Sequence, residues 1–232
     1  MDRRPAISLI IPVLNEAKYI GEIIQHIREL DADGAAEIII VDGDPEGSTI
    51  NTIKDESVRT VLWEKGRARQ MNHGAALATG DVLLFLHADT LLPSNAFALI
   101  QSAMNDKGFV GGAFDLGFNT RRRIFKITES YVFLRTRLTR MPFGDQAIFI
   151  SRHHFVQLGG YRDIPVMEDL ELMKRIRKRG DRIRIIPEKV RTSTRRYEQE
   201  GIVYTTLRNW MLQLQYAFGV PPERLVRWYK SG

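Results

Sequence analysis

The sequence has no cysteine among its 232 residues. Disulfide bridges, thiolate nucleophiles and Cys-based zinc sites are therefore excluded, and any site must use oxygen or nitrogen ligands. Long apolar runs are also missing, because no stretch approaches the roughly 18 uninterrupted apolar residues of a membrane span. The first residues lack the apolar core and the cleavage site of a signal peptide. We therefore expect a cytoplasmic protein.

The composition is 44% hydrophobic and 27% charged, which is typical of a soluble globular protein. The net charge of +6 is concentrated locally, because residues 174–196 hold eleven Lys and Arg against only Asp181 and Glu188. A basic segment of this kind suits phosphates, an anionic membrane or nucleic acid, and equally a solvated surface. No recognised nucleic-acid motif accompanies it, so we expect no specific nucleic-acid partner.

Short apolar runs alternate with helical patterns over the first hundred residues. The predicted strands cover residues 7–14, 37–42, 57–63 and 81–87, and the predicted helices cover 20–30, 66–79 and 93–105. This alternation predicts an α/β fold with a Rossmann-like, mostly parallel central sheet flanked by helices.

The second half is less regular. Its predicted strands cover 109–118, 146–151 and 183–186, and its predicted helices cover 121–140, 153–158, 168–179 and 201–218. The first of these helices carries one apolar stripe, formed by Ile124, Ile127, Tyr131, Leu134 and Leu138. No linker interrupts the chain, so we expect a single domain over residues 1–232, with halves of about 1–105 and 106–232.

Polar side chains follow each of the first four predicted strands. In an open parallel sheet, ligands bind beyond the carboxyl ends of the strands. Each residue taken alone also reads as an ordinary turn former. Together they predict a binding site formed by Asn15, Glu16, Asp42, Arg67, Arg69, His87 and Asp89.

Asp89 ends a strand that is otherwise wholly apolar. A carboxylate there can hold Mg²⁺ or Mn²⁺ together with phosphate oxygens, because such ions keep few protein ligands. His87 lies two residues earlier and so faces the same side, either as a partner of this site or as a histidine hydrogen-bonded at the sheet edge. Arg67 and Arg69 lie near a helix start, which suits a diphosphate or two solvated charges.

Glu168 and Asp169 open an apolar helix. Acidic residues in a first turn stabilise a helix through its dipole, by about 0.3–1 kcal/mol. The functional alternative is a general base, which must lie within hydrogen-bond reach of the hydroxyl that it deprotonates. The dipole would lower the pKa of the acid, and burial or a neighbouring carboxylate would offset that effect.

Five segments together resemble family 2 glycosyltransferases, in order and spacing, between residues 7 and 187. They are Ile-Ile-Pro-Val-Leu-Asn-Glu (10–16), Ile-Val-Asp-Gly (40–43), the glycine-to-glycine segment 66–74, Phe-Leu-His-Ala-Asp (85–89) and Met-Glu-Asp-Leu-Glu-Leu (167–172). Gly-Arg-Ala-Arg-Gln-Met-Asn and Phe-Gly-Asp-Gln also resemble a compact bacterial subgroup associated with arsenosugar biosynthesis.

The resemblance implies a GT-A fold and a nucleotide-sugar donor, usually of uridine. It implies that Pro12 to Glu16 and Asp42 contact the nucleoside, and that residues 66–72, including Asn72, lie against base and diphosphate. It also implies that Asp89 binds the metal and that Asp169 is the base of an inverting transfer. We expect Gly111 and Gly112 either to admit the sugar or to form a strand bulge, and Asp145 and Gln146 to bind donor sugar or acceptor.

Two motifs depart from the family pattern. The Asp-x-Asp motif reads His87-Ala88-Asp89, so its first carboxylate is missing, and the Gln-x-x-Arg-Trp motif of processive members is absent. A degenerate nucleotide-binding protein, or a basic protein that binds membranes or nucleic acid, is the alternative function. A nucleotidyltransferase would place glycines with Arg and Lys after the first strand, where this chain has Asn15-Glu16.

The acceptor is open at this point and is either a small molecule or lipid-linked. A peripheral membrane contact is compatible with a transferase, and the tail from Trp210 through Trp228 and Tyr229 would contribute amphipathic contact to it. Core packing is the alternative use of Trp210.

Overall fold

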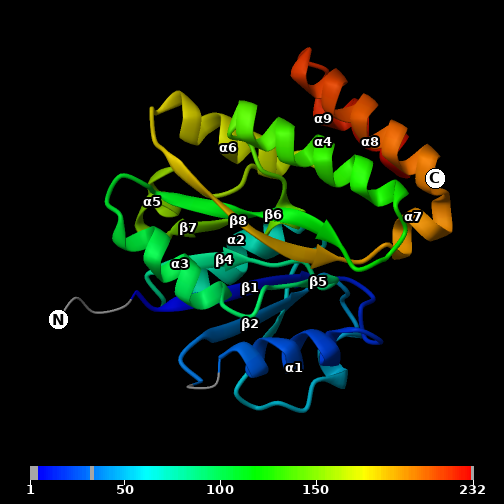
Figure 1. The fold of residues 1–232 in the computed structure, drawn as a ribbon. Helices are drawn as coiled ribbons and strands as arrows, with labels where there is room; N and C mark the ends of the chain where they lie inside the picture. The colour runs from blue at the N-terminus through cyan, green and yellow to red at the C-terminus, as the bar shows by residue number, and fades with distance from the viewer. Residues whose placement is uncertain (1–4, 32–33, 231–232) are drawn as a thin grey trace.

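The computed structural model describes residues 5–31 and 34–230. Within them an eight-stranded sheet in the order β3-β2-β1-β4-β7-β6-β8-β5 lies between layers of helices (Figure 1). Only β7 and β5 run against the other strands, so the expectation of a mostly parallel sheet is confirmed. The strands are β1 (Ile7–Val13), β2 (Glu37–Asp42), β3 (Arg59–Leu62), β4 (Val82–Phe85), β5 (Thr90–Leu91), β6 (Gly111–Phe118), β7 (Phe149–Ser151) and β8 (Ile183–Thr192).

The helices cover both faces of the sheet because successive strand residues point to opposite sides. On β1, Leu9 and Ile11 pack with the cluster that includes α1 and α3, and Ile10 packs with the cluster of α2, α5 and α6. The helices are α1 (Ile20–Leu30), η1 (Ile50–Thr52), α2 (Arg67–Leu77), α3 (Ala96–Asn105), α4 (Ile124–Thr139), η2 (Gly144–Gln146), α5 (Arg152–Gln157), α6 (Glu168–Lys178), α7 (Arg195–Glu200), α8 (Ile202–Ala217) and α9 (Pro222–Lys230).

Strand β8 continues well beyond the predicted end at residue 186. The register of the parallel β6–β8 pair jumps by two residues on the β8 side after Ile186, which leaves Pro187 and Glu188 outside the ladder. Proline has no N–H to donate, so it occurs at such irregularities. Beyond the bulge, basic residues alternate with Val190 and Thr192, which hid the strand from an apolar-run criterion.

Helix α4 packs with the opposite face to the one that its sequence suggests. Its apolar stripe is largely solvent-exposed, with Leu138 at 75% and Ile127 at 64% exposure. The buried side chains are instead Phe125, Thr128, Glu129, Val132 and Thr136. A helical period therefore located the stripe correctly but did not indicate which side faces the core.

The C-terminal helices α8 and α9 pack over α6, and α4 lies on the same side of the sheet (Figure 1). Trp210 is half-buried against Tyr131, with ring centroids 4.6 Å apart, and it also lines a cavity between α4 and α8. Trp228 is exposed, and the side chain of Tyr229 lies outside the part of the chain that is described. Across the described residues, no helix combines the length and apolar character needed to cross a bilayer.

Candidate functional site at the carboxyl edge of the sheet

Two cavities meet beyond the carboxyl ends of β1 and β4. The first, here called the α2 cleft, is lined by residues 12–14, 16, 65–70, 87–89 and 163–165. The second, here called the α4–α8 cavity, lies between α4, the 143–145 loop, the start of α6, and α7 and α8. Arg67, His87 and Asp89 line both. Arg67, His87 and Asp89 were predicted from sequence, and they lie where a molecule in one cavity would contact a molecule in the other.

Arg67 lies in the first turn of α2 and reaches across to α6. Its Nε donates to Glu168 Oε1. The Glu168 side chain is only 2% exposed. Burial alone would raise the pKa of Glu168, but the adjacent guanidinium outweighs it, so the pKa of this carboxyl is lowered. Glu168 is therefore an ionised partner that holds Arg67 at the junction of the two cavities.

Asp169 lines the α4–α8 cavity from the next position of α6. Its Oδ2 accepts the N–H of Gly144 at 2.6 Å, and its Oδ1 accepts the N–H of Leu170 at 2.7 Å. Burial is the main cause that raises the pKa of Asp169, and the charge of Glu168 adds to it. Each carboxylate oxygen keeps a second lone pair, so a fixed carboxylate of raised basicity faces the cavity.

His87 is neutral at physiological pH. Burial, followed by the charge of Arg67, lowers the pKa of its imidazole to about 4. A Cβ on Gly144 would lie 2.8 Å from His87 Nε2 and 3.5 Å from Asp169 Oδ2. Gly144 therefore allows the close approach of His87 to this loop, a requirement that sequence reasoning missed, whereas the distance to Asp169 is an ordinary contact.

Asp145 is half-buried and also lines the α4–α8 cavity. Burial raises the pKa of its carboxyl to about 6, and the charges of Asp169 and Asp89 contribute. Its Oδ1 is sealed from solvent and accepts no hydrogen bond from the described residues. Three carboxylates therefore crowd this side of the junction.

The residues at the junction fit a divalent cation through Asp89 and Asp145. Asp89 opens onto both cavities, and the orphaned Asp145 oxygen and the crowding of negative charge are what a hard cation would relieve. Within residues 5–31 and 34–230, no group of three or more His, Asp or Glu stands in position to hold a metal by itself. The remaining ligands would have to come from phosphate and water, as Mg²⁺ commonly requires.

Several predicted residues line the α2 cleft or its edge. Pro12 and Glu16 line it, and Glu16 also pairs with Arg195 at 3.0 Å. Arg69 lines it as well, with its guanidinium paired to Glu64 and Asp163. Asn15 follows β1 with a positive φ of 59° and accepts a 3.4 Å bond from Ser48.

Asp42 is fully buried, and its expected contact with a nucleoside stays a prediction. Its oxygens accept the N–H groups of Asp44, Thr49 and Ile50 at 2.9–3.2 Å. A buried carboxylate with three such bonds is satisfied by the loop itself. Asp42 therefore shapes the loop after β2 and lines neither cavity.

Gln146 and Asn72 are also used internally. Gln146 is fully buried, donates to Phe114 O at 2.9 Å and accepts from Phe143 N at 3.1 Å, so it fixes the 143–146 loop. Asn72 makes two 2.8 Å bonds to the backbone of Tyr161. Both amide groups have partners within the protein, and the contacts with base, diphosphate, donor sugar or acceptor that we expected of them stay predictions.

Gly111 and Gly112 lie at the opposite end of β6 from the site. A Cβ on Gly112 would meet Arg184 O on β8 and lie 2.5 Å from Phe149 Cζ on β7. On Gly111 it would meet Phe149 O. These glycines allow close packing of neighbouring strands, and no bulge occurs at them.

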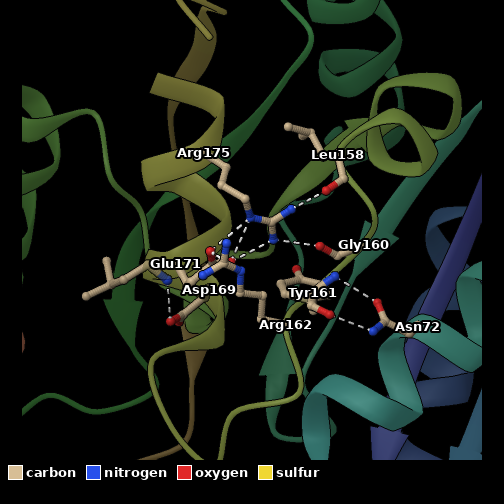
Figure 2. A network of polar contacts seen from close by, with 9 residues as sticks. Asn72, Leu158, Gly160, Tyr161, Arg162, Asp169, Glu171 and Arg175 are labelled. Atoms are coloured by element: carbon tan, nitrogen blue, oxygen red, sulfur yellow. Dashed lines mark hydrogen bonds and ion pairs between the residues drawn. The ribbon is translucent and has the colours of Figure 1, made fainter. Parts of the chain in front are cut away.

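A second network, also missed from sequence, anchors α6 (Figure 2). Arg175 pairs with Glu171 at 2.7 Å and donates to the carbonyls of Leu158 and Gly160. Arg162 pairs with the same glutamate at 3.0 Å. The only sequence signal was the four-residue spacing of Glu171 and Arg175. The network ties the 158–162 loop to the helix that carries Asp169.

Comparison with known proteins agrees with this geometry. Residues 8–161 match the glycosyl transferase family 2 domain. An uncharacterized glycosyltransferase of Mycobacterium tuberculosis is 26% identical over 183 residues, which are 75% of this chain and 70% of that protein. Glycosyltransferase GlyG of Streptococcus pneumoniae is 28% identical over 111 residues, which are 44% of this chain and 36% of that protein.

Two solved structures share the fold. The mannosyltransferase PcManGT from Pyrobaculum calidifontis, in complex with GDP-Man and Mn²⁺, matches with a TM-score of 0.62 and 22% identity over 81% of this chain. This chain spans 56% of that one. Residues 1–349 of TarS from S. aureus match with a TM-score of 0.63 and 14% identity, over 90% of this chain and 65% of that one. The fold is the GT-A fold, and this chain is a glycosyltransferase that belongs to glycosyl transferase family 2.

Proposed function

We propose that this chain transfers a sugar from a nucleotide-sugar donor, most simply a UDP-sugar, to an acceptor hydroxyl with inversion at the anomeric carbon. The observation that carries the proposal is the meeting of the two cavities at Arg67, His87 and Asp89. The donor nucleotide would occupy the α2 cleft, and the acceptor would occupy the α4–α8 cavity. The chain then acts as one domain with a donor half and an acceptor half.

Asp169 is the general base in this proposal. It takes the proton of the acceptor hydroxyl, the acceptor oxygen forms a bond to the anomeric carbon, and the bond to the nucleoside diphosphate breaks with the electron pair on phosphate. The raised pKa of Asp169 supports this role, because a stronger base removes a hydroxyl proton more readily. Gly144 and Leu170 orient the carboxylate through its two bonds.

Arg67 would bind diphosphate oxygens at the junction, and Glu168 keeps it in place. Asp89 and Asp145 would hold Mg²⁺ or Mn²⁺, which stabilises the negative charge of a leaving diphosphate. Neutral His87 would line the junction without adding positive charge. Asp145 thereby compensates for the missing first carboxylate of the Asp-x-Asp motif.

The acceptor cavity is lined mainly by uncharged groups away from the junction. Its walls include Tyr131, Trp210, Asn209 and Gln213. Aromatic faces beside amides suit an uncharged hydroxyl-bearing group such as a sugar ring. The acceptor is therefore expected to present such a group, whether it is free or attached to a lipid.

The test is a nucleotide-release assay over UDP- and GDP-sugars with Mn²⁺, with and without simple glycoside acceptors, followed by NMR of the product linkage. Acceptor-dependent release with inverted configuration supports the proposal. Retained configuration would overturn the single displacement. Nucleotide binding without any release would favour the degenerate alternative.

A further inference from the structure

Helices α4 and α8 lie side by side over the α4–α8 cavity and carry their apolar side chains outward. Tyr131 of α4 stacks near Trp210 of α8 and donates to Gln213 Oε1 at 3.3 Å. On the outer side, α4 exposes Ile127, Phe133, Leu134 and Leu138, and α8 exposes Val203, Tyr204, Leu207, Met211 and Leu214, followed by exposed Phe218 at its C-cap. We call these ten residues the outer face.

The outer face is unusual because polar side chains of the same helices are buried instead. Helix α8 buries Thr205 and Arg208 while Leu207 and Leu214 are more than half exposed. A helix whose partner is only its own domain shows the reverse pattern. Exposed apolar side chains gathered along two neighbouring helices mark an interaction site.

The charges around the outer face favour an anionic lipid surface as its partner. Helix α8 has no acidic residue, and the only acid of α4, Glu129, is buried and paired with Lys126 and Lys189. Exposed arginines lie at positions 121–123, directly before α4, and at Arg224 and Arg227 on α9, which also exposes Glu223. Apolar insertion combined with nearby cations is the pattern of helices that lie in a membrane interface.

We propose that the outer face of α4 and α8 docks this protein onto the surface of an anionic bilayer, without crossing it. Docking would place the mouth of the α4–α8 cavity at the lipid–water interface, because α4 and α8 form its walls. The proposal goes beyond the proposed reaction and does not depend on it.

The experiment is co-sedimentation of the full chain with vesicles of phosphatidylcholine, with and without phosphatidylglycerol. We expect binding to the anionic vesicles that is at least about tenfold tighter than to neutral ones and that weakens as salt is added. The double variant Leu207→Gln/Leu214→Gln should weaken binding about tenfold or more. Arg121→Gln and Arg122→Gln should each weaken binding to anionic vesicles about fivefold.

The matched control is Val156→Gln on α5, which is also an exposed aliphatic residue, at 69%, but lies outside the outer face. It should bind vesicles as the unaltered chain does. Absence of binding to any vesicle, or binding that the double variant leaves unchanged, would overturn the proposal. So would a dimer in sedimentation-velocity runs that the double variant dissociates while vesicles remain unbound, because the face would then belong to a second copy of the chain.

Discussion

Helix α1 buries four isoleucines against the sheet and exposes Glu22 and Glu29. Helix α8 buries Thr205 and Arg208 beside Leu212 and Tyr216, and it exposes Leu207 and Leu214. The two halves of the chain also differ in how regular their backbone and their buried charges are. Among the described residues, four non-glycine positions have positive φ: Asn15 precedes residue 106, and Arg140, Ala147 and Met167 follow it. Buried carboxyls with raised pKa, Asp145 and Asp169, also lie in the second half.

The difference separates what folding requires from what function uses. Strained backbone and crowded charge cost free energy and persist where the surroundings enforce them, commonly at functional sites. The first half supplies a regular scaffold, and the second half carries the departures from it. Substitutions at positions of strained backbone or crowded charge should therefore change the rate of sugar transfer more than the stability of the fold. Substitutions at close-packed strand positions should change stability more than the rate of transfer.

The largest effect is expected at the proposed base. Asp169→Asn should lower kcat about 10³-fold, because the amide cannot accept the acceptor proton. Unfolding in urea should show only a small change in stability, because removing a buried carboxyl of raised pKa favours folding, whereas the NH2 of asparagine would face one of the two backbone N–H groups that Asp169 accepts. Donor binding within a few fold of the unaltered chain serves as the control. A variant that retains normal kcat would remove Asp169 from the mechanism.

Gly112→Ala should reduce stability by about 3 kcal/mol, because the new methyl group would meet Arg184 O and the Phe149 ring within the sheet. The matched control is Gly21→Ala on α1, where a Cβ meets nothing within 4 Å. That control should gain about 0.5–1 kcal/mol from helix propensity. Urea unfolding measures both. An alanine at Gly112 that leaves stability intact but weakens donor binding would restore the sugar contact expected from sequence.

Gly144→Ala should reduce kcat about 10- to 100-fold while the protein remains folded, because the methyl group would clash with His87 and shift the loop whose N–H orients Asp169. The measurement is steady-state kinetics together with thermal unfolding. Equal kcat in the variant and the unaltered chain would show that the close packing at this loop is not needed for transfer.

Asp145→Asn should stabilise the protein relative to the unaltered chain, by an amount that increases as pH rises. The folded chain, with a carboxyl pKa of about 6, binds more protons between about pH 4 and 6 than the unfolded chain does, so the contribution of Asp145 to stability falls as pH rises through that window. Removing the carboxyl should leave stability nearly unchanged at pH 4 and raise it by about 2 kcal/mol at pH 7. Urea unfolding of the variant and of the unaltered chain at the two pH values measures this difference. An equal effect of the substitution at both pH values would contradict the raised pKa of Asp145.

The alternation of apolar runs and helices was sufficient to predict the sheet, and strand-end positions were sufficient to bring Arg67, His87 and Asp89 together. The burial of residues beyond the strand ends could not be predicted from sequence. Asp42 is enclosed by the loop that follows it, through its bonds to Asp44, Thr49 and Ile50, and Gln146 is held by Phe114, 32 residues earlier. The requirement for Gly144 comes from its contact with His87, which lies 57 residues earlier in the chain, and from its bond to Asp169, which lies 25 residues later. The period of α4 defined a stripe but carried no information on which side faces solvent.

The most direct test of the account is calorimetric titration with UDP and with GDP, each with Mn²⁺ and with EDTA, in the unaltered chain and in Asp89→Ala. We expect that one nucleoside diphosphate binds only with the metal and that Asp89→Ala abolishes this binding. A folded protein that binds neither nucleotide under any of these conditions would contradict the assignment of the α2 cleft to a nucleotide-sugar donor.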